Sequence, residues 1–244
     1  MNTKMLVFDL DGTLLNSQTV IDSPEREIIS EYSRRGVKIS YITARSPRAV
    51  TEILKDMPCD GISYYNGAMT YCDDKLIDAN LIKYADGIEI YNIFKDKDIS
   101  VYIEPYSYRK GTILNLDTRE VTDGTIYDIP ENDIQRVRII AKNLEIDLPE
   151  YLTVTTTRDD YALILNKNAK KEKALREIAK YYNIKMQDII AFGDDFNDMD
   201  MIKEAGIGVA MGNAVDELKC AADYVIDTND NNGIYKFLSD NRMM

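Results

Sequence analysis

Two clusters of acidic residues, one near each end of the chain, have types and spacing suited to metal and phosphate chemistry. Asp9 and Asp11 stand two residues apart beside Gly12, which permits the unusual backbone angles of a tight turn. The segment 193–198, Gly-Asp-Asp-Phe-Asn-Asp, holds three more carboxylates. Crowded carboxylates repel one another unless a cation offsets them, and Mg²⁺ takes oxygen ligands while retaining waters and phosphate oxygens. If the fold brings the clusters together, the sequence predicts a magnesium site.

Each cluster also has an ordinary explanation. An Asp-x-Asp-Gly sequence is common in surface turns, and acidic residues favour helix N-termini, which accounts for one or two of the three acids after Gly193. Capping does not account for all three, so the two clusters together favour the metal site.

Two further segments could hold a phosphate. Thr43 ends an apolar run, and its hydroxyl and the following backbone N–H groups of Ala44 and Arg45 can donate to phosphate oxygens, although a plain strand-to-helix turn fits equally well. Lys171 begins a predicted helix, where the helix dipole disfavours a cation, and this suggests a functional position. By composition alone a solvated basic face explains it too, because three other lysines lie nearby: Lys167, Lys170 and Lys173.

The chain of 244 residues contains no histidine. Catalysis by Ser-His-Asp or Cys-His groups and zinc held by histidine are therefore excluded. Proton transfer must fall to carboxylates, Lys, Tyr or Cys. A carboxylate nucleophile remains available, since it needs no imidazole to activate it.

The net charge and the pattern of apolar residues limit the kinds of partner that we expect for this chain. A net charge of −12, with no basic stripe, makes nucleic acid and anionic membranes unexpected partners. No apolar run reaches the roughly 18 residues of a membrane helix, and the N-terminus does not resemble a secretory signal. The three cysteines are widely spaced and are expected to be free thiols in a reducing compartment. We expect a cytoplasmic protein, monomer or homodimer, whose partner is a small-molecule phosphate ester.

The polar motifs follow short apolar runs at residues 5–8, 37–42 and 189–192, as expected for strands buried on both faces of a parallel sheet. Helical patterns lie between them, and two more strands are expected at 207–211 and 224–226. The predicted helices cover residues 23–36, opened by Ser23-Pro24, and 46–56, 170–182 and 199–205. This alternation predicts a doubly wound, mostly parallel, Rossmann-like α/β sheet, in which ligands bind at the carboxyl ends of the strands.

The middle of the chain has a different pattern. One helix is expected at 85–96, followed by strands at 100–103, 112–116, 137–141, 152–156 and 161–165, which favours an antiparallel sheet with a helix on one side. We expect a core made of residues 1–80 and 165–244, with residues 81–164 inserted as an α+β module.

The four motifs, in this order, resemble the haloacid dehalogenase superfamily of phosphohydrolases. Three other segments are similar to its Cof-like subfamily, which has a large α+β cap inserted between the second and third motifs: 63–68 (Ser-Tyr-Tyr-Asn-Gly-Ala), 208–214 (Gly-Val-Ala-Met-Gly-Asn-Ala) and 221–225 (Ala-Ala-Asp-Tyr-Val). The resemblance implies a Mg²⁺-dependent phosphatase of phosphomonoesters, with the cap setting specificity.

The resemblance also implies roles for individual residues. Asp9 matches the nucleophile that forms an aspartyl-phosphate and also binds the metal, and Asp11 matches the general acid and base, with its main-chain carbonyl on the metal. Asp194 matches the principal acidic metal ligand, and Asp195 stands where a further metal contact occurs. Phosphate contacts are implied for Leu10, Thr43, the Ala44 backbone, Lys171 and Asn197, and supporting roles for Gly12 and Asp198.

The sequence departs from the family pattern in two places. Glu172 stands where the family usually has glycine beside the lysine, and the cap is short, with no motif to align. The first residues of the cap that we expect to set substrate specificity are polar and aromatic residues around a predicted strand turn: Tyr102, Tyr106, Tyr108 and Arg109.

Three rival functions are also considered. A phosphosugar mutase or phosphotransferase has a similar core, and a non-catalytic phosphometabolite sensor could retain it. A dehalogenase would need neither the acid at Asp11 nor magnesium.

Overall fold

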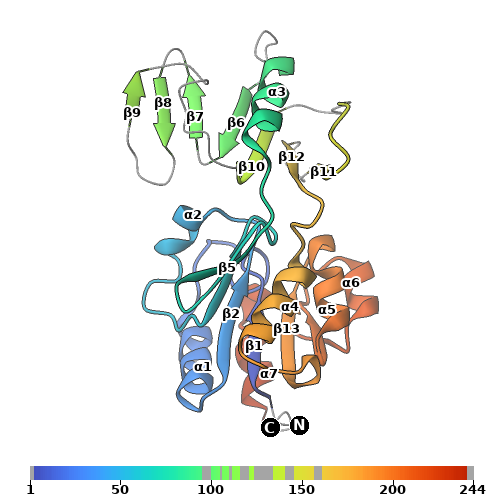
Figure 1. The fold of residues 1–244 in the computed structure, drawn as a ribbon. Helices are drawn as coiled ribbons and strands as arrows, with labels where there is room; N and C mark the ends of the chain where they lie inside the picture. Colours follow the sequence, from blue (N-terminus) through green and yellow to red (C-terminus); the bar gives the residue numbers. More distant parts are fainter. Residues whose placement is uncertain are drawn as a thin grey trace. The chain divides into compact units, whose positions relative to one another are not determined.

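The computed structural model describes residues 3–94, 100–104, 106–109, 112–115, 121–123, 134–140, 146–156 and 161–240. The chain forms two compact units. One consists of Met1–Ala79 with Lys170–Met244, and the other of Asn80–Ala169. Figure 1 shows both units, each with its own sheet. The inserted unit begins one residue before the predicted boundary and ends five residues after it.

The first unit is built on an eight-stranded sheet with the order β15-β14-β13-β1-β2-β3-β4-β5. Strands β1, β2, β3, β13, β14 and β15 run parallel, whereas β4 and β5 are added antiparallel at one edge. The strands are β1 (Met5–Phe8), β2 (Lys38–Ile42), β3 (Gly61–Tyr64), β4 (Met69–Cys72), β5 (Lys75–Ala79), β13 (Ile189–Gly193), β14 (Ile207–Ala210) and β15 (Tyr224–Val225). This is the predicted doubly wound sheet.

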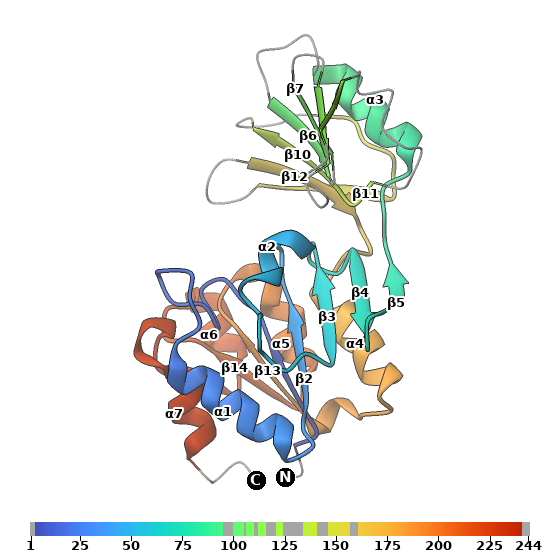
Figure 2. The same cartoon turned by 90° about the vertical axis from the view of Figure 1, so that its left-hand side faces the viewer.

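Helices on both faces bury the central strands. Helices α1 and α7 pack against each other on one face, and α4, α5 and α6 pack in sequence on the other (Figures 1 and 2). Every residue of β1 and β13 is buried, and the Phe8 and Phe192 rings stack with centroids 5.0 Å apart. The apolar runs in the sequence are therefore central strands with two covered faces. The helices are α1 (Ser23–Arg34), α2 (Pro47–Thr51), α4 (Lys171–Tyr181), α5 (Met199–Glu204), α6 (Asp216–Ala221) and α7 (Gly233–Ser239).

The start of α1 and the end of α2 differ from the prediction. The N-cap of α1 is Asp22 rather than Ser23, so the serine is the first helical residue before Pro24. Helix α2 ends at Thr51 instead of continuing to residue 56, although Ser46 caps it as expected by accepting the Ala49 N–H at 3.4 Å. The segment after α2 makes turns, and Asp56 at its end takes a positive φ of 64° that a helix does not allow.

The second unit has a seven-stranded antiparallel sheet with the order β11-β12-β10-β6-β7-β8-β9, and one described helix, α3 (Tyr84–Phe94). Its strands are β6 (Ser100–Glu104), β7 (Tyr106–Arg109), β8 (Thr112–Asn115), β9 (Val121–Asp123), β10 (Arg136–Ile140), β11 (Leu152–Thr156) and β12 (Tyr161–Asn166). A separate apolar cluster, which includes Ile90, Ile103 and Val137, forms its core. The predicted antiparallel α+β module is confirmed.

Of the residues first considered for specificity, only the side chain of Tyr102 is described. It is half-buried, and the guanidinium carbon of Arg138 lies 4.4 Å from its ring centroid. The side chains of Tyr106, Tyr108 and Arg109 lie outside the described residues.

No helix within the described ranges is both long enough and apolar enough to span a bilayer. The three cysteines are free thiols, with Cys72 buried and the other two exposed.

Candidate active site

The predicted motifs meet at one edge of the eight-stranded sheet. Asp9 directly follows β1, Thr43 follows β2 and Asp194 follows β13, and these three strands are parallel neighbours in register. The Asp9 N–H donates to the Phe192 carbonyl at 3.1 Å, which ties the end of β1 to the end of β13. Segments far apart in the sequence are thereby placed side by side at the carboxyl ends of the strands, where doubly wound sheets bind ligands.

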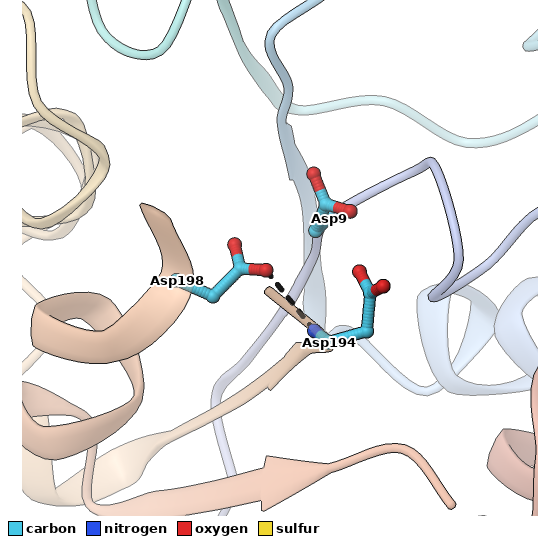
Figure 3. Close-up of side chains that lie close together, drawn as sticks. All are labelled: Asp9, Asp194 and Asp198. Carbon is cyan, nitrogen blue, oxygen red and sulfur yellow. Dashed lines mark hydrogen bonds between the residues drawn. The ribbon is translucent and has the colours of Figure 1, made fainter. Parts of the chain in front are cut away.

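Three buried carboxylates converge at this edge. Asp9, Asp194 and Asp198 are 5%, 6% and 0% exposed, and each offers an oxygen within 4.8 Å of the others (Figure 3). Buried carboxylates at this separation require an opposing charge. The two acidic clusters of the sequence thus form one group.

Lys171 supplies part of the opposing charge. Its Nζ lies 2.5 Å from Asp9 Oδ1 and 2.6 Å from Asp198 Oδ1, and its side chain is 1% exposed. Burial alone would lower the pKa of this ammonium, but Asp198 and Asp9 outweigh that effect and raise the pKa above its usual value. Among the four clustered lysines, Lys167 and Lys170 are exposed and Lys173 pairs with Asp78 at 3.0 Å, so the solvated-face explanation fails for Lys171 alone.

Asp198 holds the loop around the cluster. Its Oδ2 accepts the backbone N–H groups of Asp194 at 3.0 Å and Asp195 at 3.1 Å, while Oδ1 receives Lys171. Asp195 in turn caps the short helix 196–198 by accepting the Phe196 N–H at 2.9 Å. Helix capping therefore accounts for the acidic residues at positions 195 and 198. It does not account for Asp194. Asp195, assigned to the metal from the resemblance, lies outside the group of three.

Burial changes the acidity of this group. Burial raises the pKa of Asp194 to about 7, with repulsion from Asp198 as the next cause, while the Thr13 hydrogen bond and Lys171 oppose the change. Burial likewise raises the pKa of Asp9 well above its usual value, and Lys171 is the main opposing influence. Both carboxyls thus lack the charge compensation that a further cation would supply.

The turn after β1 is shaped to admit Asp194. Gly12 has a φ of +78°, and a Cβ atom at this position would lie 2.2 Å from Asp194 Oδ2. The neighbouring Thr13 hydroxyl donates to Asp194 Oδ1 at 3.1 Å. The expected glycine turn is confirmed, and it has a second cause in the close approach of the carboxylate.

Asp11 lies apart from the three buried carboxylates. Its side chain is 54% exposed and is held by the Arg45 guanidinium. Sequence reasoning used only the backbone of Arg45 and missed this side chain. The sequence clue to the Arg45 side chain was its position two residues after Thr43, in the loop that follows β2, the strand next to β1.

The segment after β2 is arranged to leave one donor available. Thr43 is fully buried, and its Oγ1 accepts the Arg45 N–H at 3.1 Å, so the hydroxyl hydrogen is left to donate elsewhere. Ala44 lies between them and is half-buried. In the turn after β1, the Leu10 carbonyl accepts the Leu15 N–H at 2.8 Å, which fixes the peptide between Leu10 and Asp11.

Asn197 is exposed beside the acidic group, and its Nδ2 donates to Asn66 Oδ1 at 3.1 Å. Asn66 belongs to the turn between β3 and β4, in one of the segments that resembled the Cof-like subfamily. Sequence reasoning gave it no role.

The donor set fits a magnesium ion. Both oxygens of Asp198 accept hydrogen bonds, Asp9 Oδ1 receives Lys171 and Asp194 Oδ1 receives Thr13, which leaves Asp9 Oδ2 and Asp194 Oδ2 for a cation. Mg²⁺ is usually held by one or two carboxylates together with waters and phosphate oxygens.

Comparisons with known proteins agree with this geometry. A family model described as haloacid dehalogenase-like hydrolase matches residues 6–238. The 5-amino-6-(5-phospho-D-ribitylamino)uracil phosphatase YcsE of Bacillus subtilis is 29% identical over 245 residues, which cover 96% of this chain and 93% of the relative. YitU of the same organism, a phosphatase of the same name, is 28% identical over 268 residues and 98% of each chain.

A solved structure shares the whole fold. The crystal structure of a haloacid dehalogenase-like hydrolase from Bacteroides thetaiotaomicron superimposes with a TM-score of 0.85, covering 97% of this chain and 98% of that one at 24% identity. With a family match over nearly all of its length and the family's motifs assembled at one edge of the sheet, the chain belongs to the haloacid dehalogenase-like hydrolases, in their Cof-like subfamily.

Proposed function

We propose that this phosphatase hydrolyses a small phosphorylated metabolite through an aspartyl-phosphate on Asp9, with Mg²⁺ as cofactor. The observation that carries the proposal is the contact of Lys171 with Asp9 inside a buried group of three carboxylates. A site built only for stability gains little from buried charges, because their desolvation offsets most of their mutual attraction.

Asp9 is the nucleophile in this proposal. One carboxylate oxygen attacks the phosphorus atom, the bond from phosphorus to the leaving oxygen breaks, and an aspartyl-phosphate forms. Lys171 holds Oδ1 at 2.5 Å and thereby fixes the orientation of the Asp9 carboxylate. The same ammonium favours the ionised carboxylate against the effect of burial.

Asp11 transfers the protons. It donates a proton to the leaving oxygen as the bond breaks, and then accepts one from the water that attacks the aspartyl-phosphate, so that phosphate is released and the enzyme is restored. Its carboxyl is exposed and is held in orientation by the Arg45 guanidinium. The Thr43 hydroxyl, Lys171 and Asn197 hold the phosphoryl oxygens, with backbone N–H groups of Leu10 and Ala44.

Asp9 and Asp194 would hold the magnesium ion, with the main-chain carbonyl of Asp11. When bound, the ion would offset the charge of the carboxylates and of the phosphate, which otherwise repel each other. Asp198 and Thr13 keep Asp194 in place through the hydrogen bonds described above.

The substrate class follows from the chemistry and from the relatives. The site residues recognise only a phosphate monoester and a cation, so the leaving group must be recognised elsewhere, and the inserted unit 80–169 is the part of the chain proposed to do so. The names of two relatives specify a phosphate on a ribityl chain. This supports a sugar phosphate or a similar polyol phosphate as the substrate.

The proposal is tested with p-nitrophenyl phosphate and a panel of sugar phosphates. Turnover should need added Mg²⁺, be absent in excess chelator and not be restored by Ca²⁺, whose longer bonds and higher coordination number misplace the nucleophile. Asp9→Asn should lower kcat by several orders of magnitude, as expected for loss of an essential nucleophile. Full activity in chelator, or turnover of Asp9→Asn within tenfold of wild type, would contradict the proposal. Phosphate that appears on an added sugar instead of in water would indicate the mutase.

A further inference from the structure

The turn between β3 and β4 has a backbone that its sequence only partly explains. Tyr65, Asn66 and Gly67 take consecutive positive φ values of 53°, 58° and 102°. An Asn-Gly pair is common in hairpin turns with this conformation, so the second and third residues are ordinary. Tyr65 is not, because a bulky residue in the left-handed region is strained by roughly 1–2 kcal/mol, and this ring is 1% exposed. Something outside the turn must hold it.

The contacts that hold the turn come from two of the phosphate-binding segments. The Tyr65 N–H donates to the Arg45 carbonyl at 3.2 Å, and the Asn66 N–H donates to the Thr43 carbonyl at 2.9 Å. On the other side, a Cβ at Gly67 would lie 2.4 Å from the carbonyl oxygen of Lys170, the residue before Lys171. The turn therefore packs between the Thr43 segment on one side and the start of α4 on the other.

The side chain of Asn66 reaches a third segment. Its Oδ1 accepts the Nδ2 hydrogen bond of Asn197 at 3.1 Å. An exposed amide can otherwise rotate freely, and each rotation changes whether its N–H groups or its oxygen face a neighbouring anion. Because Asn66 Oδ1 accepts from Asn197, it selects the rotamer with the nitrogen toward Asn66. The second Nδ2 hydrogen of Asn197 is then available to a phosphate.

We propose that Asn66 is a positioning residue of the phosphate site, which acts by fixing the amide of Asn197 and by joining the Thr43 and Lys171 segments through its strained turn. The inference rests on the proposed function, since Asn197 is taken as a phosphate contact. The contacts with the Thr43 and Lys171 segments account for the left-handed conformation of the turn, which the preference of Asn-Gly for hairpin turns does not explain at Tyr65.

The variant Asn66→Gly removes the amide and keeps the backbone, because glycine adopts positive φ without strain. Asn183→Gly is the matched control: Asn183 has a φ of 53° in the turn after α4, before the start of β13 and therefore at the end of the sheet opposite the site. Two quantities are measured for each variant. They are the KM and kcat for p-nitrophenyl phosphate, and the Kd of inorganic phosphate by calorimetry in saturating Mg²⁺.

For Asn66→Gly we expect the KM and the phosphate Kd to rise roughly tenfold, the effect of losing one well-placed hydrogen bond to an anion, with the melting temperature at or above that of wild type. Asn183→Gly should leave both constants unchanged. In an Asn197→Ala background, Asn66→Gly should add less than a twofold loss, because the group it positions is absent. Should Asn66→Gly fail to fold, Asn66→Ala provides the same measurement at the cost of some backbone strain.

Two results would overturn the inference: unchanged constants in Asn66→Gly, or a loss of the same size with and without Asn197. The calorimetric measurement separates it from the proposed function. A wild-type protein that binds phosphate with help from Asn66 but shows no turnover would contradict the phosphatase mechanism and leave the positioning role standing.

Discussion

The guanidinium of Arg45 holds both carboxylate oxygens of Asp11, with Nε 2.7 Å from Oδ2 and an Nη nitrogen 2.5 Å from Oδ1. A planar, two-point contact of this kind fixes the orientation of the carboxylate as well as its position. The group proposed to transfer protons is thereby tied to the segment proposed to bind phosphate.

Removing Arg45 should therefore impair the proton transfer. We expect Arg45→Ala to lower kcat by roughly tenfold on a sugar phosphate, whose alkoxide leaving group needs a proton, and by much less on p-nitrophenyl phosphate, whose leaving group does not. Arg45→Lys should recover little, because an ammonium cannot bind both oxygens in one plane. Equal losses on the two substrates would show that Arg45 does not act through Asp11.

A methyl group at Gly12 should disrupt the metal site. The added Cβ would meet Asp194 Oδ2 at 2.2 Å, so Gly12→Ala must displace a proposed ligand. We expect activity to fall at least a hundredfold and a higher Mg²⁺ concentration to be needed for half-maximal rate. The matched control is Gly36→Ala, which has a φ of +88° but no atom within 4 Å of the added Cβ. It should lose about 1 kcal/mol of stability from backbone strain and keep full activity.

Lys171 should contribute to stability as well as to activity. Lys171→Met leaves Asp9 and Asp198 buried without their cation, a change that typically costs about 3–5 kcal/mol. We expect the free energy of unfolding, measured in urea, to fall by about that amount, and added Mg²⁺ to recover part of it. Lys170→Met alters the exposed neighbour and should change neither quantity. Unchanged stability in Lys171→Met would mean that the ammonium does not compensate the cluster.

Glu25 should make the stability of the protein depend on pH. Burial raises its pKa to about 7, although backbone N–H groups of Ile234 and Tyr235 at the start of α7 bind the carboxylate and lower it. Because the folded pKa exceeds the unfolded one, this group stabilises the fold below about pH 4.5, and that contribution is lost as the pH rises through 7.

The test compares the free energy of unfolding of Glu25→Gln and wild type across this range. Glu25→Gln should gain on wild type as the pH rises, by at most about 3 kcal/mol at pH 8, since one pKa unit corresponds to about 1.4 kcal/mol. Glu27→Gln, exposed on the same helix, should show a constant difference. A constant difference for Glu25→Gln as well would contradict the prediction.

The central strands and the flanking helices were predictable because burial on two faces leaves an unbroken apolar run. The strands β3, β4 and β5 were missed for the opposite reason. They are strands of four or five residues on one side of the sheet; β3 and β4 alternate between buried and half-buried residues over only four positions, and the edge strand β5 is exposed or half-buried along its whole length. The pairing of β4 and β5 is antiparallel and follows from the turns that connect them, which have no apolar pattern.

The features of the candidate site likewise divide into those that the sequence could predict and those that it could not. The acidic clusters were visible because carboxylates crowd together in the sequence itself. The distinction of Lys171 from three neighbouring lysines, the pairing of Asp11 with Arg45, and the contact of Asn197 with Asn66 all join residues from different elements. Such contacts depend on which helix face turns inward and on which strands are neighbours, and a single sequence does not contain that information.

The sheet order also bears on how the protein is made. Strand β1 pairs with β2, Met5 opposite Lys38, but its other partner is β13, where Met5 faces Ile189. A ribosome adding roughly 5–20 residues per second needs many seconds to reach β13. Throughout that interval the strand Met-Leu-Val-Phe, with four apolar side chains, has an unpaired backbone edge, and Asp9 lacks both Lys171 and the Asp194 loop. Until the last quarter of the chain is made, the nascent N-terminal part therefore presents an unpaired strand edge, which is a template for aggregation.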